Sequence, residues 1–186
     1  MVLPIYLYGH PVLRKVSEDI NEDYPELKKL VSDMFETMYN SEGVGLAAPQ
    51  IGKSIRLIVI DGDVLSDKFP ECKDLKLTLI NPELEVVEEE SPVTRDEGCL
   101  SLPGLSEAVK RHEHVILKWL DEDFHPHTQE FKGFASRIIQ HEFDHLEGEV
   151  YTDHVSPIRK QLIKSKLNNI SKGKVSCEYK TKSAAK

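Results

Sequence analysis

The sequence predicts an α+β fold in which a central helix packs among small antiparallel or mixed β-sheets, with an N-terminal and a C-terminal helix. Residues 25–39 carry apolar side chains at three- and four-residue spacing, which is typical of an amphipathic helix. Residues 55–61 are a short, mostly β-branched apolar run and predict a buried strand. Residues 131–146 return to the helical spacing.

The segments between these helices are predicted to be mostly extended. Residues 77–87 form a second strand region, and Pro82 within it indicates an edge or a bulge, because proline cannot donate to a sheet. Residues 108–120 alternate apolar and polar side chains, and residues 121–127 form a hairpin loop. Helices that bracket several strands in this way favour the α+β class.

Two helices complete the prediction. In the helix over residues 131–146, Phe134 and Ile138 share a stripe with two histidines, so we expect the histidines to face the core. A last helix begins at Ser156-Pro157, an N-cap followed by a first-turn proline. Its apolar residues are expected on one side: Ile158, Leu162, Ile163 and Leu167.

Length and composition bound the class of protein. The chain has 186 residues, 39% of them hydrophobic and 30% charged, which fits one globular domain. No run approaches the roughly 20 apolar residues of a membrane span, and the first residues show neither the basic n-region nor the small-residue cleavage site of a signal peptide. The three cysteines are too few for a disulfide framework, and we expect Cys72 and Cys177 to be free thiols. These features predict a cytoplasmic protein that does not enter membranes.

Charge is distributed unevenly along the chain. From Ser156 onward there are nine basic residues and one acidic residue, a charge of +8. The remainder holds 15 basic and 31 acidic residues, a charge of −16. The apolar pattern fades after Ser171, so we expect one domain over residues 1–170 and a basic, flexible tail over residues 171–186. Such a tail either meets a polyanion or serves solubility alone.

The most informative stretch is the His-Glu-x-x-His pattern at residues 141–145. Residues four apart lie on the same helix face, about 6 Å along the axis, so His141 and His145 can bind one metal ion. Glu142 can then touch a water at that ion without binding the metal itself. The alternative is an exposed helix that carries two histidines by chance.

A catalytic site of this kind needs a third protein ligand and an open fourth position. A third histidine six residues after His145 is excluded, because that position is Tyr151. His154 and Glu178 are candidates farther along the chain, but nothing around either favours it. Upstream, a thiolate from Cys99 would complete a Cys/His/His set. The residues alone leave these choices open.

Three motifs together resemble the peptide deformylases, in their typical bacterial form. They are Gly-Val-Gly-Leu-Ala-Ala-Pro-Gln at residues 43–50, Glu-Gly-Cys-Leu-Ser-Leu-Pro at 97–103, and Gln-His-Glu-Phe-Asp-His-Leu-Glu-Gly at 140–148. They follow one another in the family's order, and the resemblance extends over residues 4–167. It implies that residues 1–170 form the catalytic domain of an enzyme that removes the N-formyl group from the N-terminal methionine of newly made proteins, releasing formate.

The resemblance also implies a metal centre. Cys99, His141 and His145 would hold one divalent cation, Fe²⁺ in the cell, with Zn²⁺, Ni²⁺ or Co²⁺ as alternatives in purified protein. Glu142 would accept a proton from the attacking water and pass it to the leaving amine. The Gln50 side chain and the Leu100 backbone N–H would stabilise the oxyanion that forms.

The remaining roles that the resemblance implies concern substrate and support. Gly43 and Gly45 would let the backbone of an N-formylmethionyl peptide approach an exposed edge. The methionine side chain would enter an apolar pocket formed by Val44, Phe134 and Ile138. Glu97 and Arg111 would form a structural ion pair under the site.

This interpretation does not assign a definite role to two side chains on the predicted metal-binding helix. Arg137, one turn before His141, either lines the pocket with its stem and keeps its head in solvent, or binds a carboxylate. Asp144 points to a different face of the helix, so we expect it to support the ligands rather than bind the metal.

The expected partners are nascent chains, with no DNA and no membrane, and the expected state is a monomer. The basic C-terminal helix suggests a ribosome contact. Two rival functions remain: a His-Glu-x-x-His peptidase that uses His154 or Glu178 as third ligand, and a non-enzymatic module in which the same three residues hold a structural metal.

Overall fold

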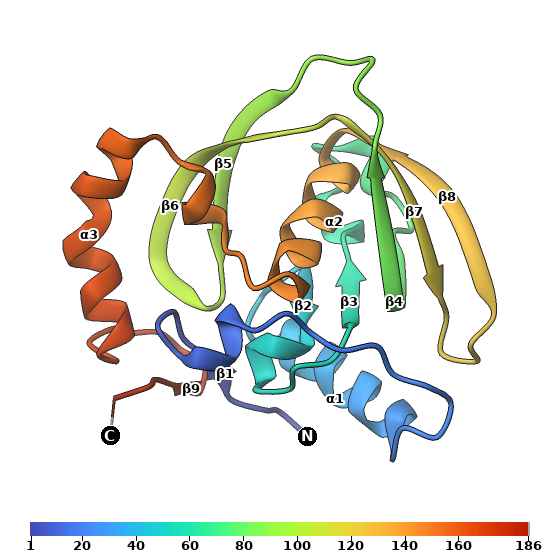
Figure 1. Ribbon diagram of the computed structural model, residues 1–186, viewed down its shortest axis with the longest axis horizontal. Helices are drawn as coiled ribbons and strands as arrows, with labels where there is room; N and C mark the ends of the chain where they lie inside the picture. Colours follow the sequence, from blue (N-terminus) through green and yellow to red (C-terminus); the bar gives the residue numbers. More distant parts are fainter. Residues whose placement is uncertain (186) are drawn as a thin grey trace.

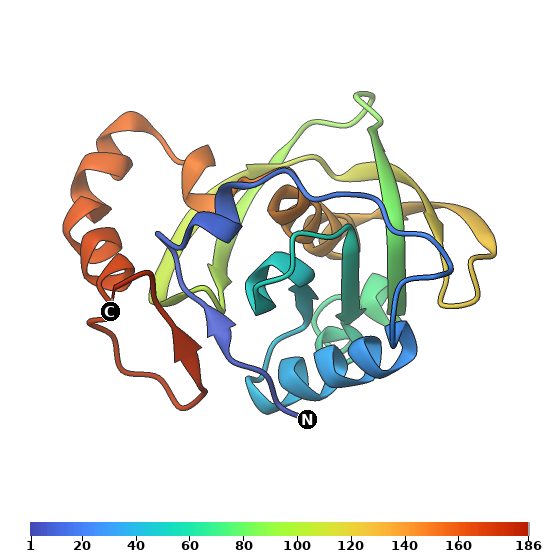
Figure 2. The ribbon, with the colours of Figure 1, turned by 60° about the horizontal axis from the view of Figure 1, so that its bottom comes forward.

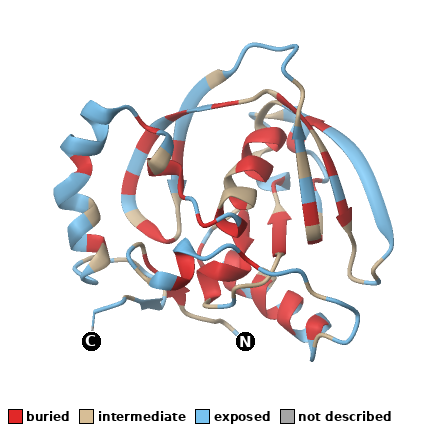
Figure 3. Ribbon diagram, in the orientation of Figure 1, coloured by how far each residue is buried: buried red, intermediate tan, exposed pale blue. Residues whose placement is uncertain are grey.

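A computed structural model describes residues 1–185, and the last residue of the basic tail, Lys186, lies outside the described residues. The helix α2 (Gly133–Leu146) runs through the middle of the molecule, with a β-hairpin on one side and a larger sheet on the other (Figure 1). Figure 3 shows most of α2 as buried. The α+β prediction with a central helix is therefore confirmed.

The larger sheet has five antiparallel strands in the order β2-β3-β4-β7-β8. These are β2 (Gly45–Ala47), β3 (Leu57–Asp61), β4 (Lys76–Val86), β7 (His114–Leu120) and β8 (Pro126–Lys132). The pairing of β4 with β7 shifts register between Ile80 and Glu83, the irregularity that Pro82 predicts. Strand β2 is an edge strand, so its outer side is open to further pairing.

The hairpin consists of β5 (Val93–Cys99) and β6 (Leu102–Arg111). The extended segment expected over residues 108–120 is thus divided between two sheets, because the chain leaves β6 at Arg111 and starts β7 at His114. The pairing of β5 with β6 is irregular between Gly98 and Cys99. This irregularity places Cys99 and the turn that follows it next to α2.

Helix α2 and the larger sheet share one hydrophobic core. Ala135, Ile138 and Ile139 of α2 pack against the inward side chains of the strands, including Ile58, Ile60, Leu79, Val115, Leu117 and Trp119. A second cluster packs α1 (Leu27–Asn40) on the other face of the sheet. Each fully buried aliphatic side chain stabilises the fold by about 1.5–3 kcal/mol. This packing fixes the position of α2.

The chain ends lie together beside the hairpin. Helix α3 (Pro157–Ser171) begins at the Ser156 N-cap as predicted, and β1 (Ile5–Tyr6) pairs in parallel with β9 (Thr181–Lys182). Short 3₁₀ helices complete the elements, at Pro11–Arg14, Ala48–Ile51, Asp63–Leu65, Pro70–Cys72 and Tyr151–His154. None of the helices in residues 1–185 combines the length and the apolar character needed to cross a bilayer.

The prediction of one apolar side for α3 is wrong in part. Ile163 and Ile170 are buried against the hairpin side of the molecule, but Ile158 and Leu162 are 74% and 63% exposed. Figure 3 shows most of α3 as exposed. The helix therefore packs through a narrow strip and leaves two large apolar side chains among its basic residues.

Candidate metal centre and active site

Three potential metal ligands converge between α2 and the end of β5. The rings of His141 and His145 lie one helical turn apart, with centroids 5.3 Å from each other. The Sγ atom of Cys99 lies 3.4 Å from Nε2 of His145. The ligand atoms of all three residues lie within 4.8 Å of one another. Cys, His and His are donors that suit Zn²⁺ and similar divalent transition metals, so these residues form a candidate metal site.

A buried carboxylate oxygen beside these donors supports the presence of a further group. Oε2 of Glu142, the residue after His141, is buried and has no hydrogen-bond partner within residues 1–185. A buried polar atom without a partner costs about 1–3 kcal/mol, so such atoms usually face an ion or a water in the working protein. A carboxylate that serves a water on a bound cation must keep one oxygen free for that water, and Oε2 of Glu142 is free in this way.

A carboxylate orients the first histidine. Oε1 of Glu97 lies 2.8 Å from Nδ1 of His141, which leaves Nε2 of the ring for a metal. Arg111 holds Glu97 in a bidentate ion pair, with both N–O distances at 2.9 Å. Both side chains are about 5% exposed, so the pair is shielded from solvent. Glu97 and Arg111 thus form a buried brace behind the metal ligands.

Arg137 joins the same brace. Its Nη1 lies 2.6 Å from Oε2 of Glu97 and 2.8 Å from the carbonyl of Val109, and its Nη2 lies 2.6 Å from the carbonyl of Val93. The alternative with the head in solvent is wrong, because the whole side chain is buried. The sequence could not show that Glu97 is the carboxylate that binds Arg137, because the two residues lie 40 positions apart.

The two rival third ligands lie elsewhere. Nε2 of His154 lies 2.8 Å from Oδ2 of Asp144. The same oxygen accepts a hydrogen bond from Nη1 of Arg111 at 2.6 Å. Glu178 is exposed in the segment after α3 and is absent from the three-donor group. Cys99 is the third donor that the structure brings to the histidines.

Burial shifts the pKa values of the ionisable groups around the centre. Burial lowers the pKa of His145 to about 3, which keeps the ring neutral and its lone pair available. Burial opposes the charged form of His141 as well, but hydrogen bonds with Cys99 and Glu97 raise its pKa well above the ordinary value. Burial raises the pKa of Glu142 to about 7, close to the value that suits a general acid and base at neutral pH.

The raised pKa of Glu142 predicts a pH-dependent stability of the metal-free protein. A carboxyl with a pKa higher in the folded than in the unfolded state stabilises the fold below the unfolded value, and this contribution is lost as the pH rises through about 7. We expect the free energy of unfolding to fall by about 2–3 kcal/mol from this group between pH 5 and pH 8. Glu142→Gln should remove that part of the pH dependence, as measured by urea unfolding of chelator-treated protein. An equal pH dependence in both proteins would contradict the burial argument.

Two potential oxyanion donors lie beside the same centre. The side chain of Gln50 accepts a hydrogen bond from the Ala47 N–H at 3.0 Å. Its Nε2 donates toward Ser101 Oγ at 3.2 Å and toward Cys99 Sγ at 3.4 Å, so its N–H bonds point at the cluster. Leu100 directly follows Cys99 in the turn between β5 and β6.

A cavity of about 620 Å³ opens onto these groups. Val44, Phe134 and Ile138, the residues expected to hold an apolar side chain, all line it. The Phe134 ring stacks on Phe69 with centroids 4.1 Å apart, which gives this part of the cavity a rigid apolar wall. Further lining residues include Gly43, Gly45, Gln50, Cys99, Leu100, Arg137, His141 and Glu142.

Four of the lining residues that the sequence analysis missed lie far along the chain from its three motifs. Leu65 belongs to a short 3₁₀ helix, and Ser176, Cys177 and Tyr179 follow α3. No periodic pattern marks these positions, and the last three come from the segment that was expected to be a flexible tail. Their proximity to the cavity depends on long-range contacts alone.

Position 45 must be a glycine because the side chain of Glu142 lies against its backbone. A Cβ atom at this position would lie 2.6 Å from Oε1 and 2.8 Å from Cγ of Glu142. We therefore expect Gly45→Ala to displace the carboxylate and to lower kcat/KM by about tenfold to a hundredfold, while bound metal and melting temperature change little. Steady-state kinetics with metal analysis would check this. An unchanged kcat/KM would show that Glu142 tolerates the displacement.

Comparisons with known proteins agree with this geometry. Residues 2–161 match the model of the polypeptide deformylase family. The chain is 46% identical to the peptide deformylase of Christiangramia forsetii over 97% of this chain and 95% of that protein. It is 47% identical to that of Flavobacterium johnsoniae over 100% and 97%. A crystal structure of Arabidopsis thaliana peptide deformylase 1B with an inhibitor superposes with a TM-score of 0.80 at 31% identity, covering 92% of each chain. The chain therefore belongs to the peptide deformylases, the metal-dependent hydrolases that remove the N-formyl group from newly made proteins.

Proposed function

We propose that Cys99, His141 and His145 hold one divalent cation, Fe²⁺ in the cell, and that Glu142 is the general acid and base of the deformylation. The observation that carries this proposal is the buried, unpartnered oxygen of Glu142, which lines the cavity together with Cys99 and His141, two of the three converging donors. When bound, a divalent cation lowers the pKa of a coordinated water and polarises the formyl carbonyl.

The proposed work of the protein groups follows from their positions. Glu142 takes a proton from the attacking water and later delivers it to the amine of the methionine, so that formate leaves. The Gln50 amide and the Leu100 N–H donate to the oxygen of the formyl group as it becomes negative. Removing one such donor typically costs about 3–4 kcal/mol of transition-state stabilisation. Gln50 is held for this task by its bond with Ala47.

We propose that an N-formylmethionyl peptide adds to the edge of the larger sheet. Strand β2 begins at Gly45 and has a partner on one side only, so Gly45 and the preceding Gly43 carbonyl and Val44 N–H can offer backbone groups to an extended substrate. The methionine side chain then enters the apolar part of the cavity beside Phe134 and Ile138. In this arrangement the formyl carbon approaches Glu142 and the metal ligands.

Release of formate from formyl-Met-Ala-Ser tests this function directly. Protein prepared without oxygen, and then loaded in parallel with Fe²⁺, Zn²⁺, Ni²⁺ or Co²⁺, should contain one metal per chain and release one formate per peptide. The Fe²⁺ assignment requires that protein isolated anaerobically from its own cells contains iron. Formate release without any bound metal would contradict the proposal.

We propose that the enzyme works as a monomer in the cytoplasm and touches the ribosome through α3. The basic side chains of this helix, including Lys160 and Lys164, are exposed beside the apolar Ile158 and Leu162. Reversing the charge at two positions, with Lys160→Glu and Lys164→Glu in one variant, should weaken binding to ribosomes and reduce the salt dependence of that binding. The matched reversal of exposed Lys53 and Lys73 should not. Equal effects of both pairs would contradict a specific contact.

A further inference from the structure

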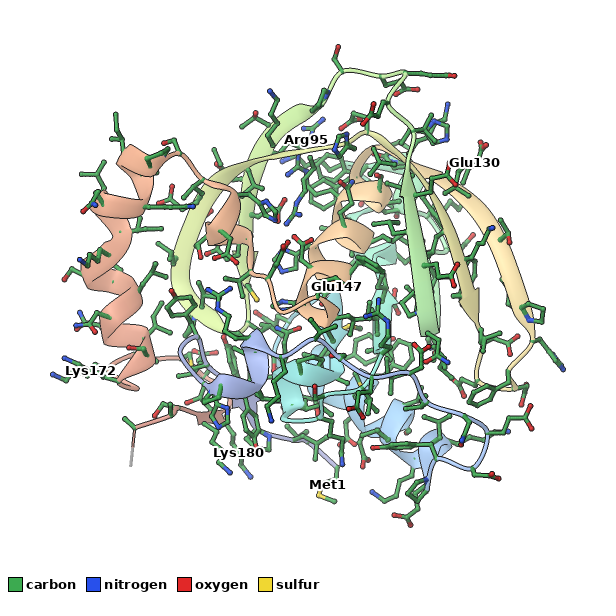
Figure 4. The ribbon with its side chains drawn as sticks, viewed as in Figure 1. Met1, Arg95, Glu130, Glu147, Lys172 and Lys180 are labelled. Atoms are coloured by element: carbon green, nitrogen blue, oxygen red, sulfur yellow. The ribbon has the colours of Figure 1, made fainter. Side chains whose placement is uncertain are left out.

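The segment after α3 returns to the active site. Helix α3 ends at Ser171, and Gly173, with φ of +71°, turns the chain back. The segment then runs beside the N-terminal strand (Figure 2). The Ile5 N–H donates to the carbonyl of Lys180 at 2.9 Å, and the Leu7 N–H donates to that of Lys182 at 2.9 Å. Figure 4 shows Lys180 beside this strand.

Tyr179 reaches from this segment to the turn that follows Cys99. Its hydroxyl donates a hydrogen bond to the carbonyl of Leu100 at 2.7 Å. Its ring packs on the hydrophobic cluster that also holds the side chain of Leu100. Burial raises the pKa of the phenol, so the hydroxyl keeps its proton at neutral pH. Tyr179 itself lines the cavity together with Cys99 and Glu142.

Other contacts in this turn hold the neighbours of Leu100, because Cys99 pairs with Leu102 and Gln50 Nε2 donates to Ser101 Oγ. Leu100 and Ser101 connect β5 to β6 where the strand pairing is irregular, so regular sheet bonds do not fix Leu100. The Tyr8 N–H holds the next carbonyl, that of Ser101, at 2.8 Å. The two chain ends thus hold two successive carbonyls of the same turn. Loss of the Tyr179 bond would remove the hydrogen bond to the Leu100 carbonyl, so that the Leu100 backbone can shift relative to the metal ligands.

We propose that Tyr179 is a positioning residue of the deformylase, which holds Leu100 so that its N–H faces the reacting formyl oxygen, and that residues 176–179 form a wall of the substrate cavity. This inference rests on the proposed role of Leu100 as an oxyanion donor. A misplaced donor raises the free energy of the transition state more than that of the bound substrate. The reason is that the donor's hydrogen bond is fully formed only in the transition state. The C-terminal segment is then part of the active site.

Tyr179→Phe tests the positioning role, because it removes the hydroxyl and keeps the ring. We expect kcat to fall about tenfold with formyl-Met-Ala-Ser, while KM stays within about twofold and the melting temperature within a few degrees. The matched control is Tyr24→Phe, which changes a half-buried tyrosine of the same cluster and should leave kcat unchanged. A lower melting temperature with unchanged kcat would reduce Tyr179 to a structural role and overturn the proposal.

Alkylation of Cys177 tests the cavity wall without using turnover. In metal-loaded Glu142→Gln protein, saturating formyl-Met-Ala-Ser should slow iodoacetamide labelling of Cys177 several-fold, as followed by peptide mass spectrometry. An unchanged labelling rate would show that the segment does not face the bound peptide. Either negative result leaves the formate-release test of the wild-type protein unaffected, so the inference can fail while the proposed function stands.

Discussion

Replacing Glu142 by Gln should abolish deformylation while metal and fold are retained. The amide has nearly the same shape as the carboxylate but cannot take a proton from water. General acid and base catalysis contributes about 10²–10⁴-fold, and Glu142 is proposed to perform both transfers, so we expect kcat/KM to fall at least a thousandfold. The metal content and the melting temperature of the metal-loaded variant should match the wild type, because Glu142 is not among the three donors.

The control for this variant is Glu149→Gln. Glu149 follows the same helix but is half-exposed and lies 3.8 Å from His154, away from the cavity. It should keep full activity. If Glu142→Gln retained more than about a tenth of the wild-type kcat/KM, another group would have to move the proton, and the assignment of Glu142 would be wrong.

Cys99→Ala should lose both metal and activity. The thiolate is one of three protein ligands, and the two histidines alone form an incomplete site for a catalytic zinc-type ion. We expect less than a tenth of the wild-type metal after dialysis and no formate release above background. Cys72→Ala is the matched control, because Cys72 is a free thiol buried in the main core and does not line the cavity.

The same variant separates the rival functions. A peptidase with His154 or Glu178 as third ligand would keep its metal after Cys99→Ala. The placement of His154 on Asp144 argues against that rival. A module with a structural metal would show no turnover in the unmodified protein, and it would need a fourth protein ligand, which the three-donor group within residues 1–185 does not provide.

The sequence could predict those parts of the fold and site that local spacing determines. Helix α2 follows from its apolar stripe, and its two histidines follow from the four-residue interval. The α3 start at Ser156 follows from capping chemistry. In each case the information lies within one or two helical turns.

Other parts depend on contacts between distant residues. Cys99 lies 46 residues from His145, and only the resemblance to a family selected it among the possible third ligands. The bond of Arg137 with Glu97 and that of Tyr179 with Leu100 span 40 and 79 residues. No period of a helix or strand connects such positions. The exposure of Ile158 and Leu162 was missed for a related reason, because the helical pattern does not reveal how wide a strip of α3 is covered.

X-ray absorption at the edge of the bound metal tests the central claim most directly. In zinc-loaded protein we expect one sulfur ligand at about 2.3 Å and two imidazole nitrogens at about 2.0–2.1 Å, with a light atom from solvent in the fourth position. The sulfur shell should disappear in any residual metal bound to Cys99→Ala. A wild-type spectrum with nitrogen and oxygen ligands only would contradict the assignment of Cys99, His141 and His145 as the metal centre.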